Sequence, residues 1–293
     1  MKDDQPETEP LGSLAYEPRV VAFLDILGFR SFVSEGHAEA VRKIKAIDDA
    51  LEHTLRCIKE QDDEGWVSIR TFSDCFSLST ENKYLPTLLD AVAFLQWYLA
   101  VSGIFVRGGI SSGYHCETSR MIFSQGLVRA YELQAHDPYP RVLIAPELIP
   151  KILRLSYSTS WGGCGALAEY VLVDGENVCF LDYLQTVVIA GGLGGDADDL
   201  LEEHAQAIRQ QLAMHAADDG VVRKHLWLAK YHNFRVTEIF DESDWDPEYR
   251  QDFLLRLLIA PSGSGSVDVD TTRVSFVHLQ PEIPQDDQTD EVQ

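Results

Sequence analysis

Apolar residues in the first third of the chain follow two different spacings. Residues 20–24 form a continuous apolar run, which predicts a buried strand. Between residues 36 and 60 the apolar positions recur at helical spacing, which predicts an amphipathic helix. Residues 66–72 and 75–79 alternate on either side of Ser73 and Asp74, a pattern typical of a β-hairpin with a very tight tip.

The next segments complete a recognisable order of elements. Residues 84–101 predict a second helix with Gly103 just past its end, and residues 104–111 return as a strand. The order is strand, helix, hairpin, helix, strand, which is the split βαβ arrangement of ferredoxin-like and palm folds. We therefore predict an α/β (α+β) domain with a central, mostly antiparallel sheet flanked by helices.

The second half of the chain predicts further elements and the limits of the domain. We expect a helix at 126–134, a strand at 142–145, a hairpin around Gly175, helices at 197–216, 220–233 and 251–259, and an edge strand at 273–279. Acidic, proline-containing ends predict disordered tails at 1–18 and 281–293, and the Gly/Ser-rich run 261–266 predicts a linker. We therefore predict one domain over 19–260 with a helical C-terminal extension. Residues 261–293 would follow as a linker, an edge strand and an acidic tail.

Composition narrows the possible partners. The net charge is −23, with 24 Lys and Arg against 47 Asp and Glu. A surface that grips phosphate backbones needs clustered cations, so we expect no binding to nucleic acid, and the same acidity argues against docking on anionic membranes. A small anionic substrate stays open, because bound metal ions invert the local field.

The cysteines and the N-terminal residues indicate the compartment. Five cysteines, an odd number without any Cys-x-x-Cys pair, predict a reduced, cytoplasmic chain without a zinc site. The first seven residues are acidic and lack an apolar core, so they do not look like a signal peptide. The most apolar stretch, 88–106, contains Asp90 and Gln96, which argues against a membrane span.

Two aspartates stand at the ends of apolar, strand-like runs. Asp25 follows the first strand, and Asp74 occupies the hairpin tip. Either one alone is equally well explained as a capping or turn residue. Together they form the kind of carboxylate pair that holds divalent cations beside a nucleoside triphosphate.

Three ordered motifs resemble class III nucleotidyl cyclases. They are Asp25-Ile-Leu-Gly-Phe29, the hairpin aspartate Asp74, and Arg107-Gly-Gly-Ile-Ser-Ser-Gly113. The resemblance covers residues 20–145, roughly half of the chain. These variants, with Gly-Leu-Val-Arg-Ala-Tyr-Glu-Leu at 126–133, look most like the pyrimidine (uridylate or cytidylate) cyclases of bacterial anti-phage signalling.

The resemblance implies a phosphorus–oxygen lyase that converts UTP to 3′,5′-cyclic UMP and pyrophosphate with two Mn²⁺ or Mg²⁺ ions per site. Asp25 and Asp74 would bridge the ions, and the Ile26 carbonyl would be a further metal ligand. The turn containing Gly28 and Phe29 precedes a helix, so its amides are placed to bind substrate phosphates. The resemblance also implies a head-to-tail homodimer with composite sites, and a separate effector that senses the product.

Arg70 is the candidate residue for reading the base. It lies four residues before Asp74, where purine cyclases carry a base-reading lysine. A guanidinium offers only hydrogen-bond donors, which fits the O4 acceptor of uracil better than the N4 donor of cytosine. We therefore expect Arg70 to favour UTP, with CTP as the alternative. The competing interpretation is a strand arginine that pairs with one of the excess acids.

One part of the family pattern is missing. Class III cyclases usually carry Asn and, one turn later, Arg on the helix that here spans 126–134, and this chain lacks the pair. Arg129 is our candidate for the transition-state cation from a shifted position, with a surface arginine as the alternative, and Lys230 is a second cationic candidate. We interpret Arg107 as a structural residue, and glycines 108, 109 and 113 as positions of close packing.

Two other functions stay open. The first is a cytidylate or purine nucleotide cyclase. The second is a catalytically degenerate, cyclase-like protein that binds a nucleotide or a protein partner without turnover. The missing Asn/Arg pair favours the degenerate protein, whereas the two retained aspartates favour an enzyme.

Overall fold

The first half of the chain folds in the predicted order. The computed structural model describes residues 15–34, 36–61, 67–158, 167–186, 197–241, 251, 254, 256–260 and 276–279. Its first elements are strand β1 (Glu17–Ile26), helices α1 (Phe29–Ser34) and α2 (His37–Gln61), the hairpin of β2 (Ser68–Phe72) and β3 (Cys75–Glu81), helix α3 (Leu85–Val101) and strand β4 (Val106–Glu117). The sequence pattern did not predict α1, and it ended β4 at residue 111.

The second half adds short strands and two long helices. They are β5 (Ile122–Ser124), α4 (Gln125–Ala135), β6 (Val142–Ile144), α5 (Ile149–Ser158), β7 (Val171–Val173), β8 (Cys179–Leu181), α7 (Ala197–Met214), α8 (Asp219–Asp241) and β9 (Val277–His278). Helix α5 and strand β5 were not predicted. The predicted linker at 261–266, residues 1–14 and residues 281–293 lie outside the described residues, as do residues 252, 253 and 255 of the predicted helix at 251–259.

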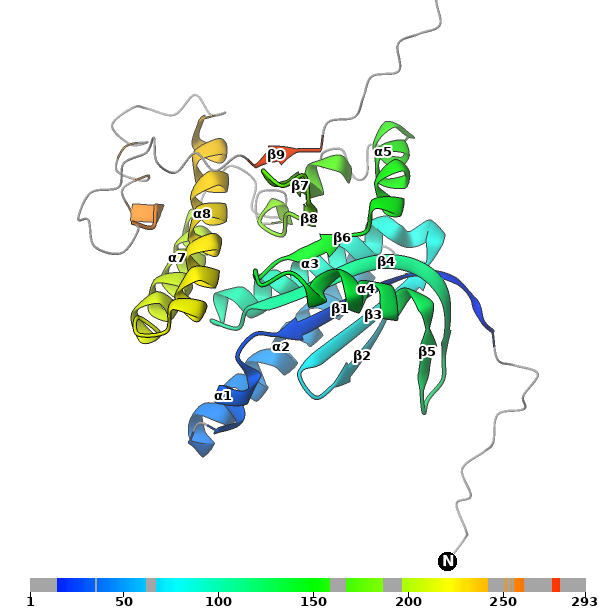
Figure 1. Cartoon of the computed structure of the whole chain (residues 1–293), viewed down its shortest axis with the longest axis horizontal. Helices are drawn as coiled ribbons and strands as arrows, with labels where there is room; N and C mark the ends of the chain where they lie inside the picture. The colour runs from blue at the N-terminus through cyan, green and yellow to red at the C-terminus, as the bar shows by residue number, and fades with distance from the viewer. Residues whose placement is uncertain are drawn as a thin grey trace, which may run out of the picture.

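A single sheet joins the two halves (Figure 1). Its strand order is β2–β3–β1–β4–β6–β8–β7–β9, with β5 paired to β4. Only the pairing of β4 with β6 is parallel among the described strands. The predicted mixed α/β class with a mostly antiparallel sheet is therefore confirmed.

The two faces of β1 serve different purposes. Val20, Ala22, Leu24 and Ile26 lie in the hydrophobic core, which α2 and α3 cover. The alternate residues face the other way, because side chains of a strand point to opposite faces. Phe23 contacts Tyr131 of α4 with ring centroids 5.4 Å apart, and Asp25 lies on this second face as well.

Helix α3 forms the centre of the core. It packs against β1, β3 and β4 on one side and against α2 and α7 on the others. By length and composition the helical segment Asn82–Val101 could cross a membrane, but 78% of its most apolar window is buried inside the protein. Asp90 is buried here, and this burial raises its pKa to about 7, although a hydrogen bond with Tyr170 opposes the shift.

Glycines let α4 approach the sheet closely. A Cβ at Gly109 would lie 2.4 Å from the carbonyl oxygen of Ala130 in α4. A Cβ at Gly113 would lie 2.7 Å from the backbone nitrogen of Gly126 in α4. Gly108 lies close to the neighbouring strand instead, because a Cβ there would lie 2.1 Å from the carbonyl oxygen of Phe23 in β1. The prediction that these glycines serve close packing is confirmed.

Candidate metal and nucleotide site

The fold brings Asp25 and Asp74 together. Asp25 lies opposite Cys75 in the β1–β3 register, and the two-residue turn of Ser73 (φ 58°) and Asp74 precedes Cys75 directly. The N–H of Ile26 donates to the carbonyl of Asp74 at 2.9 Å, which fixes the hairpin tip beside the end of β1. One ligand atom from each of Asp25, Asp74 and Cys75 lies within 4.8 Å of the other two.

Cys75 is a member of this group that sequence reasoning missed. Its Sγ lies 3.7 Å from Oδ1 of Asp74 and 4.0 Å from Oδ1 of Asp25. Burial and the two neighbouring carboxylates raise the pKa of this thiol to about 12. The only feature of the sequence that could have indicated Cys75 as a site residue is its position directly after Asp74.

Arg107 forms an ion pair with Asp25. It lies opposite Asp25 on β4, and its Nε and Nη2 are each 3.0 Å from Oδ2 of Asp25. Burial raises the pKa of Asp25, and the hydrogen bond and charge of Arg107 oppose that rise. Arg107, interpreted from the sequence as structural, therefore compensates the charge of a candidate metal ligand.

The turn after β1 has the shape expected for binding phosphates, with one difference. Gly28 adopts a left-handed conformation (φ 75°), and the chain then enters α1. The N–H of Leu27 donates to the carbonyl of Phe105 at 2.9 Å, so this amide is occupied. The amides of residues 28–30 donate to no group among the described residues. The ring of Phe29 packs against the hydrophobic core, which gives this predicted substrate residue a structural contact.

Helix α8 brings a second cation toward Asp25. The charge of Lys224 is one of those that act on Asp25, where it favours the ionised carboxylate. The next residue, His225, packs its ring 5.4 Å from that of Phe105, next to the turn after β1. Lys230, the second cationic candidate from the sequence, is exposed on the same helix, and the charges that act most on Asp25 are those of Arg107, Asp74 and Lys224.

Arg70 is held by an acidic residue that sequence reasoning missed. Glu117, at the end of β4, accepts hydrogen bonds from Arg70 (2.5 Å), Ser68 (2.6 Å) and Ser79 (3.3 Å). Nε2 of His115 lies 3.5 Å from the same carboxylate. Burial alone would raise the pKa of Glu117, but the hydrogen bonds from Ser68 and Arg70 lower it below its usual range. The competing interpretation, a strand arginine paired with an acid, thus describes the Arg70 contact found.

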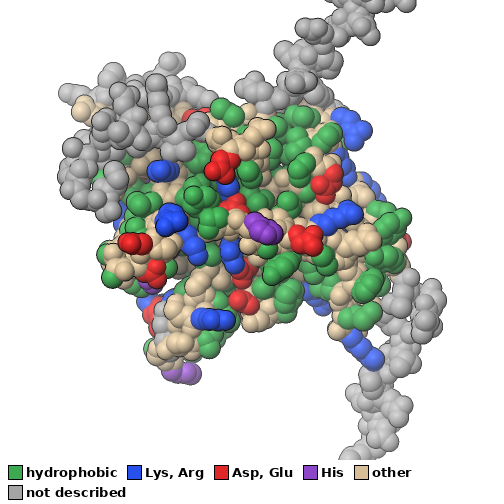
Figure 2. All heavy atoms as spheres, viewed as in Figure 1, with side chains coloured by type: hydrophobic (Ala, Val, Ile, Leu, Met, Phe, Trp, Pro, Cys, Tyr) green, Lys and Arg blue, Asp and Glu red, His purple; other side chains and the backbone are tan. Residues whose placement is uncertain are grey.

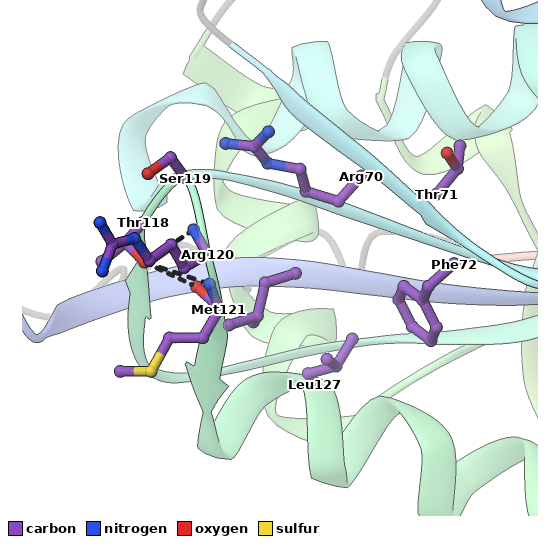
Figure 3. A pocket seen from close by; sticks show the side chains of 9 residues that line it. Arg70, Thr71, Phe72, Thr118, Ser119, Arg120, Met121 and Leu127 are labelled. Atoms are coloured by element: carbon purple, nitrogen blue, oxygen red, sulfur yellow. Dashed lines mark hydrogen bonds between the residues drawn. The ribbon is translucent and has the colours of Figure 1, made fainter. Parts of the chain in front are cut away.

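Arg70 also lines a cavity on the same face of the sheet as Asp25. It pairs with Ser77, which pairs with Phe23, two residues before Asp25. Standard strand spacings then separate Arg70 from Asp25 by about 7 Å along the strands and about 10 Å across them. The cavity has a volume of about 370 Å³, and Figure 3 shows Arg70 and Phe72 extending from β2 beside the turn between β4 and β5. Its remaining lining residues are Thr71, Thr118, Ser119, Arg120, Met121, Ile122 and Leu127.

Arg129 lies apart from the two aspartates within one chain. Its Nη1 donates to the carbonyl of Ser112 at 3.0 Å, and its side chain is exposed. Ser112 lies opposite Val20, five residues before Asp25 on β1, which is about 17 Å along the strand. The structure therefore does not bring Arg129 to the carboxylate pair of its own chain.

Exposed apolar side chains surround a second cavity beside α4. This cavity of about 620 Å³ is lined by Tyr16, Ile122, Phe123, Ser124, Gln125, Leu127, Val128, Arg129 and Glu132. Tyr16 packs against Tyr114 and Phe123 with ring centroids 5.2 and 5.7 Å apart. The exposed apolar residues of this region are Tyr16, Phe72, Tyr114, Met121, Phe123, Val128 and Tyr131.

The charged surface has mixed signs. On the face shown in Figure 2, Lys and Arg side chains are scattered among Asp and Glu side chains rather than gathered into one basic patch.

Comparison with known proteins gives similarities of fold at low identity. The chain matches no family model and no curated protein. Among solved structures it is similar to the adenylyl cyclase CyaB from P. aeruginosa, with 18% identity and a TM-score of 0.35 over 48% of this chain and 83% of that one. It is also similar to the guanylyl cyclase Cya2, with 12% identity and a TM-score of 0.34 over 58% of this chain and 92% of that one.

A bacterial light-regulated adenylyl cyclase gives a further match. Its identity is 11% and its TM-score 0.36, over 58% of this chain and 52% of that chain. The chain thus spans about half the length of that protein. Similarities this low identify neither an activity nor a substrate.

Proposed function

We propose that this protein is a nucleotidyl cyclase that converts UTP to 3′,5′-cyclic UMP and pyrophosphate. The observation that carries the proposal is the half-buried group of Asp25 and Asp74 at the end of β1, directly before the turn that leads into α1. Carboxylates in such a place are costly to bury unless they bind cations. A turn with free amides beside them suits the phosphates of a nucleoside triphosphate.

The donor set fits divalent ions such as Mn²⁺ or Mg²⁺. Asp25 and Asp74 supply hard carboxylate oxygens within one ion's reach of each other, and the backbone of Ile26 lies next to the hairpin tip. When bound, such ions neutralise the phosphates and lower the pKa of the ribose 3′-hydroxyl. The residues of the chain would position the 3′-oxygen in line with the α-phosphorus.

Cations of the chain complement this arrangement. Arg107 is paired with Asp25 and is therefore placed beside the triphosphate that the site would hold. The amides of residues 28–30 follow the end of β1 directly, and the charge of Lys224 acts on Asp25, so both suit the β- and γ-phosphates. These groups stabilise the charge of the leaving pyrophosphate.

The base is assigned to the cavity beside Arg70. Glu117 fixes this guanidinium through Nε, so its remaining N–H groups keep a defined direction. A fixed set of donors matches the O4 and O2 acceptors of uracil, which supports UTP over CTP. Phe72 lines the same cavity and offers a ring on which the base can stack.

A homodimer would complete the site. The exposed apolar residues around Tyr16 and Phe123 have the character of a contact surface between subunits. Arg129 lies on this surface, so in a head-to-tail dimer it is available to the aspartates of the partner chain. The cyclic product would act on a separate effector, and anti-phage signalling is the role that the motif resemblance suggests.

Incubation of the purified protein with each of the four nucleoside triphosphates and Mn²⁺ tests the proposal. Mass spectrometry should find cyclic UMP and pyrophosphate with UTP, and at most minor product with the other three. A purine or cytidine product would replace the substrate assignment. Absence of every cyclic product, with retained nucleotide binding, would support a degenerate cyclase.

A further inference from the structure

The thiol of Cys75 is out of place in a site for hard ions. Mg²⁺ prefers oxygen ligands, and thiolate sulfur prefers softer ions such as Zn²⁺. Nevertheless Cys75 lies directly opposite Asp25 in the β1–β3 register, so both side chains project from the same face of the sheet. The pairing of β1 with β3 therefore places the sulfur atom of Cys75 beside the carboxylates of Asp25 and Asp74.

The distances suit a small tetrahedral ion. With Zn–S bonds of about 2.3 Å and Zn–O bonds of about 2.0–2.2 Å, a tetrahedral site separates sulfur from each oxygen by about 3.6 Å. The observed separations are 3.7 Å to Asp74 Oδ1 and 4.0 Å to Asp25 Oδ1. The two sulfur–oxygen separations therefore lie within a few tenths of an ångström of the tetrahedral value, and one ligand atom of each residue lies within 4.8 Å of the others.

Asp25 divides its two oxygens between different partners. Oδ2 accepts from Arg107, whereas Oδ1 faces Cys75. An ion held by the two Oδ1 atoms and the sulfur leaves the Arg107 ion pair intact. The ion and Arg107 together balance the negative charges of two carboxylates and a thiolate, so the filled site is formally neutral.

We propose that Asp25, Asp74 and Cys75 bind a thiophilic divalent ion of the Zn²⁺ class, and that this ion inhibits the cyclase by occupying the carboxylates needed for catalysis. The inhibitory half of the proposal rests on the proposed function, whereas the binding half does not. On binding, the ion forms a bond to Cys75 Sγ, and the thiol proton passes to solvent. A water molecule completes the four ligands.

Titration of the full chain with Co²⁺ tests the binding half without any turnover. The wild-type protein should show a near-ultraviolet sulfur-to-cobalt charge-transfer band that Zn²⁺ displaces, and Cys75→Ser should lack it. Cys179→Ser is the matched control, because Cys179 is also a half-buried free thiol whose pKa is raised by burial and by the neighbouring carboxylate of Asp174. This control should keep the band, and circular dichroism should show that both variants are folded.

Inhibition by Zn²⁺ tests the regulatory half. Cyclic nucleotide formation in Mn²⁺ should be inhibited by Zn²⁺, and the half-inhibitory concentration should rise at least about tenfold in Cys75→Ser. Equal inhibition of wild type and Cys75→Ser would overturn this half. A wild-type protein without the cobalt band, or a band that survives Cys75→Ser, would overturn the binding half. A wild-type protein that forms no cyclic product refutes the proposed function while the cobalt spectrum still decides metal binding.

Discussion

Gly109→Ala should destabilise the protein by moving α4 away from the sheet. The added Cβ would lie 2.4 Å from the carbonyl oxygen of Ala130 and 3.1 Å from Cβ of Leu133. Both clashing groups belong to the backbone or its first side-chain atom, so no flexible side chain can turn away. Gly109 also pairs with Phe23 of β1 and Leu143 of β6, which holds it from both sides.

The size of the effect follows from this geometry. Relief of the clash requires α4 and β4 to separate by at least about 0.6 Å, and overpacking of this kind costs about 1–3 kcal/mol. We expect a loss of about 2–3 kcal/mol in the free energy of unfolding, because the contact is between two backbones. For a domain of this size the midpoint of thermal unfolding should fall by roughly 4–12 °C.

Urea unfolding followed by circular dichroism measures this loss. The midpoint should fall while the slope m stays unchanged, because the amount of buried surface is the same. Gly36→Ala is the control, since no atom lies within 4 Å of the added Cβ there. It should change the free energy of unfolding by less than about 1 kcal/mol. A Gly109→Ala protein as stable as wild type would refute the close packing of α4 on β4.

Three further predictions concern charge. Glu117→Gln should lower the preference for UTP over CTP by roughly tenfold, because Arg70 loses the carboxylate that accepts its hydrogen bond. The ratio of kcat/KM for UTP to kcat/KM for CTP measures this preference, and an unchanged ratio would contradict the prediction. Lys224→Met should raise the KM for UTP by roughly tenfold, whereas Lys230→Met should not, and equal effects would remove Lys224 from the site. Hydrogen bonding to a glutamate raises the pKa of His278, so its stabilisation is complete below its unfolded pKa and is lost as pH rises through the folded value. Wild-type stability should therefore fall as pH rises above the usual histidine pKa of about 6.5, and His278→Gln should lessen this fall in urea titrations.

Local patterns were sufficient to predict the longer strands and helices in the first half of the fold. The alternation around Ser73 and Asp74 and the apolar run before Asp25 specify a hairpin and a buried strand, and both are observed. Antiparallel pairing of β1 with β3 then places the two aspartates side by side. The short elements α1, β5 and α5 were missed, because their few residues carry little periodicity and their tertiary contacts decide their structure.

The partners of the site residues could not be predicted from the sequence. Arg107 meets Asp25, and Glu117 meets Arg70, through strand pairing and the bend of β4, which bring together residues 82 and 47 positions apart. The charge of Lys224 acts on Asp25 from α8, whose next residue, His225, packs against Phe105. Such contacts depend on the register and on the orientation of helices, neither of which leaves a local pattern.

The central claim is that Asp25 and Asp74 hold divalent ions beside a triphosphate. Titration of Mn²⁺ in the presence of 3′-deoxy-UTP, which cannot cyclise, measures bound ions by electron paramagnetic resonance. The account predicts that wild type binds Mn²⁺ together with the nucleotide, and that folded Asp25→Asn and Asp74→Asn proteins each bind it at least about tenfold more weakly. Equal Mn²⁺ binding by the wild type and both variants would contradict the account.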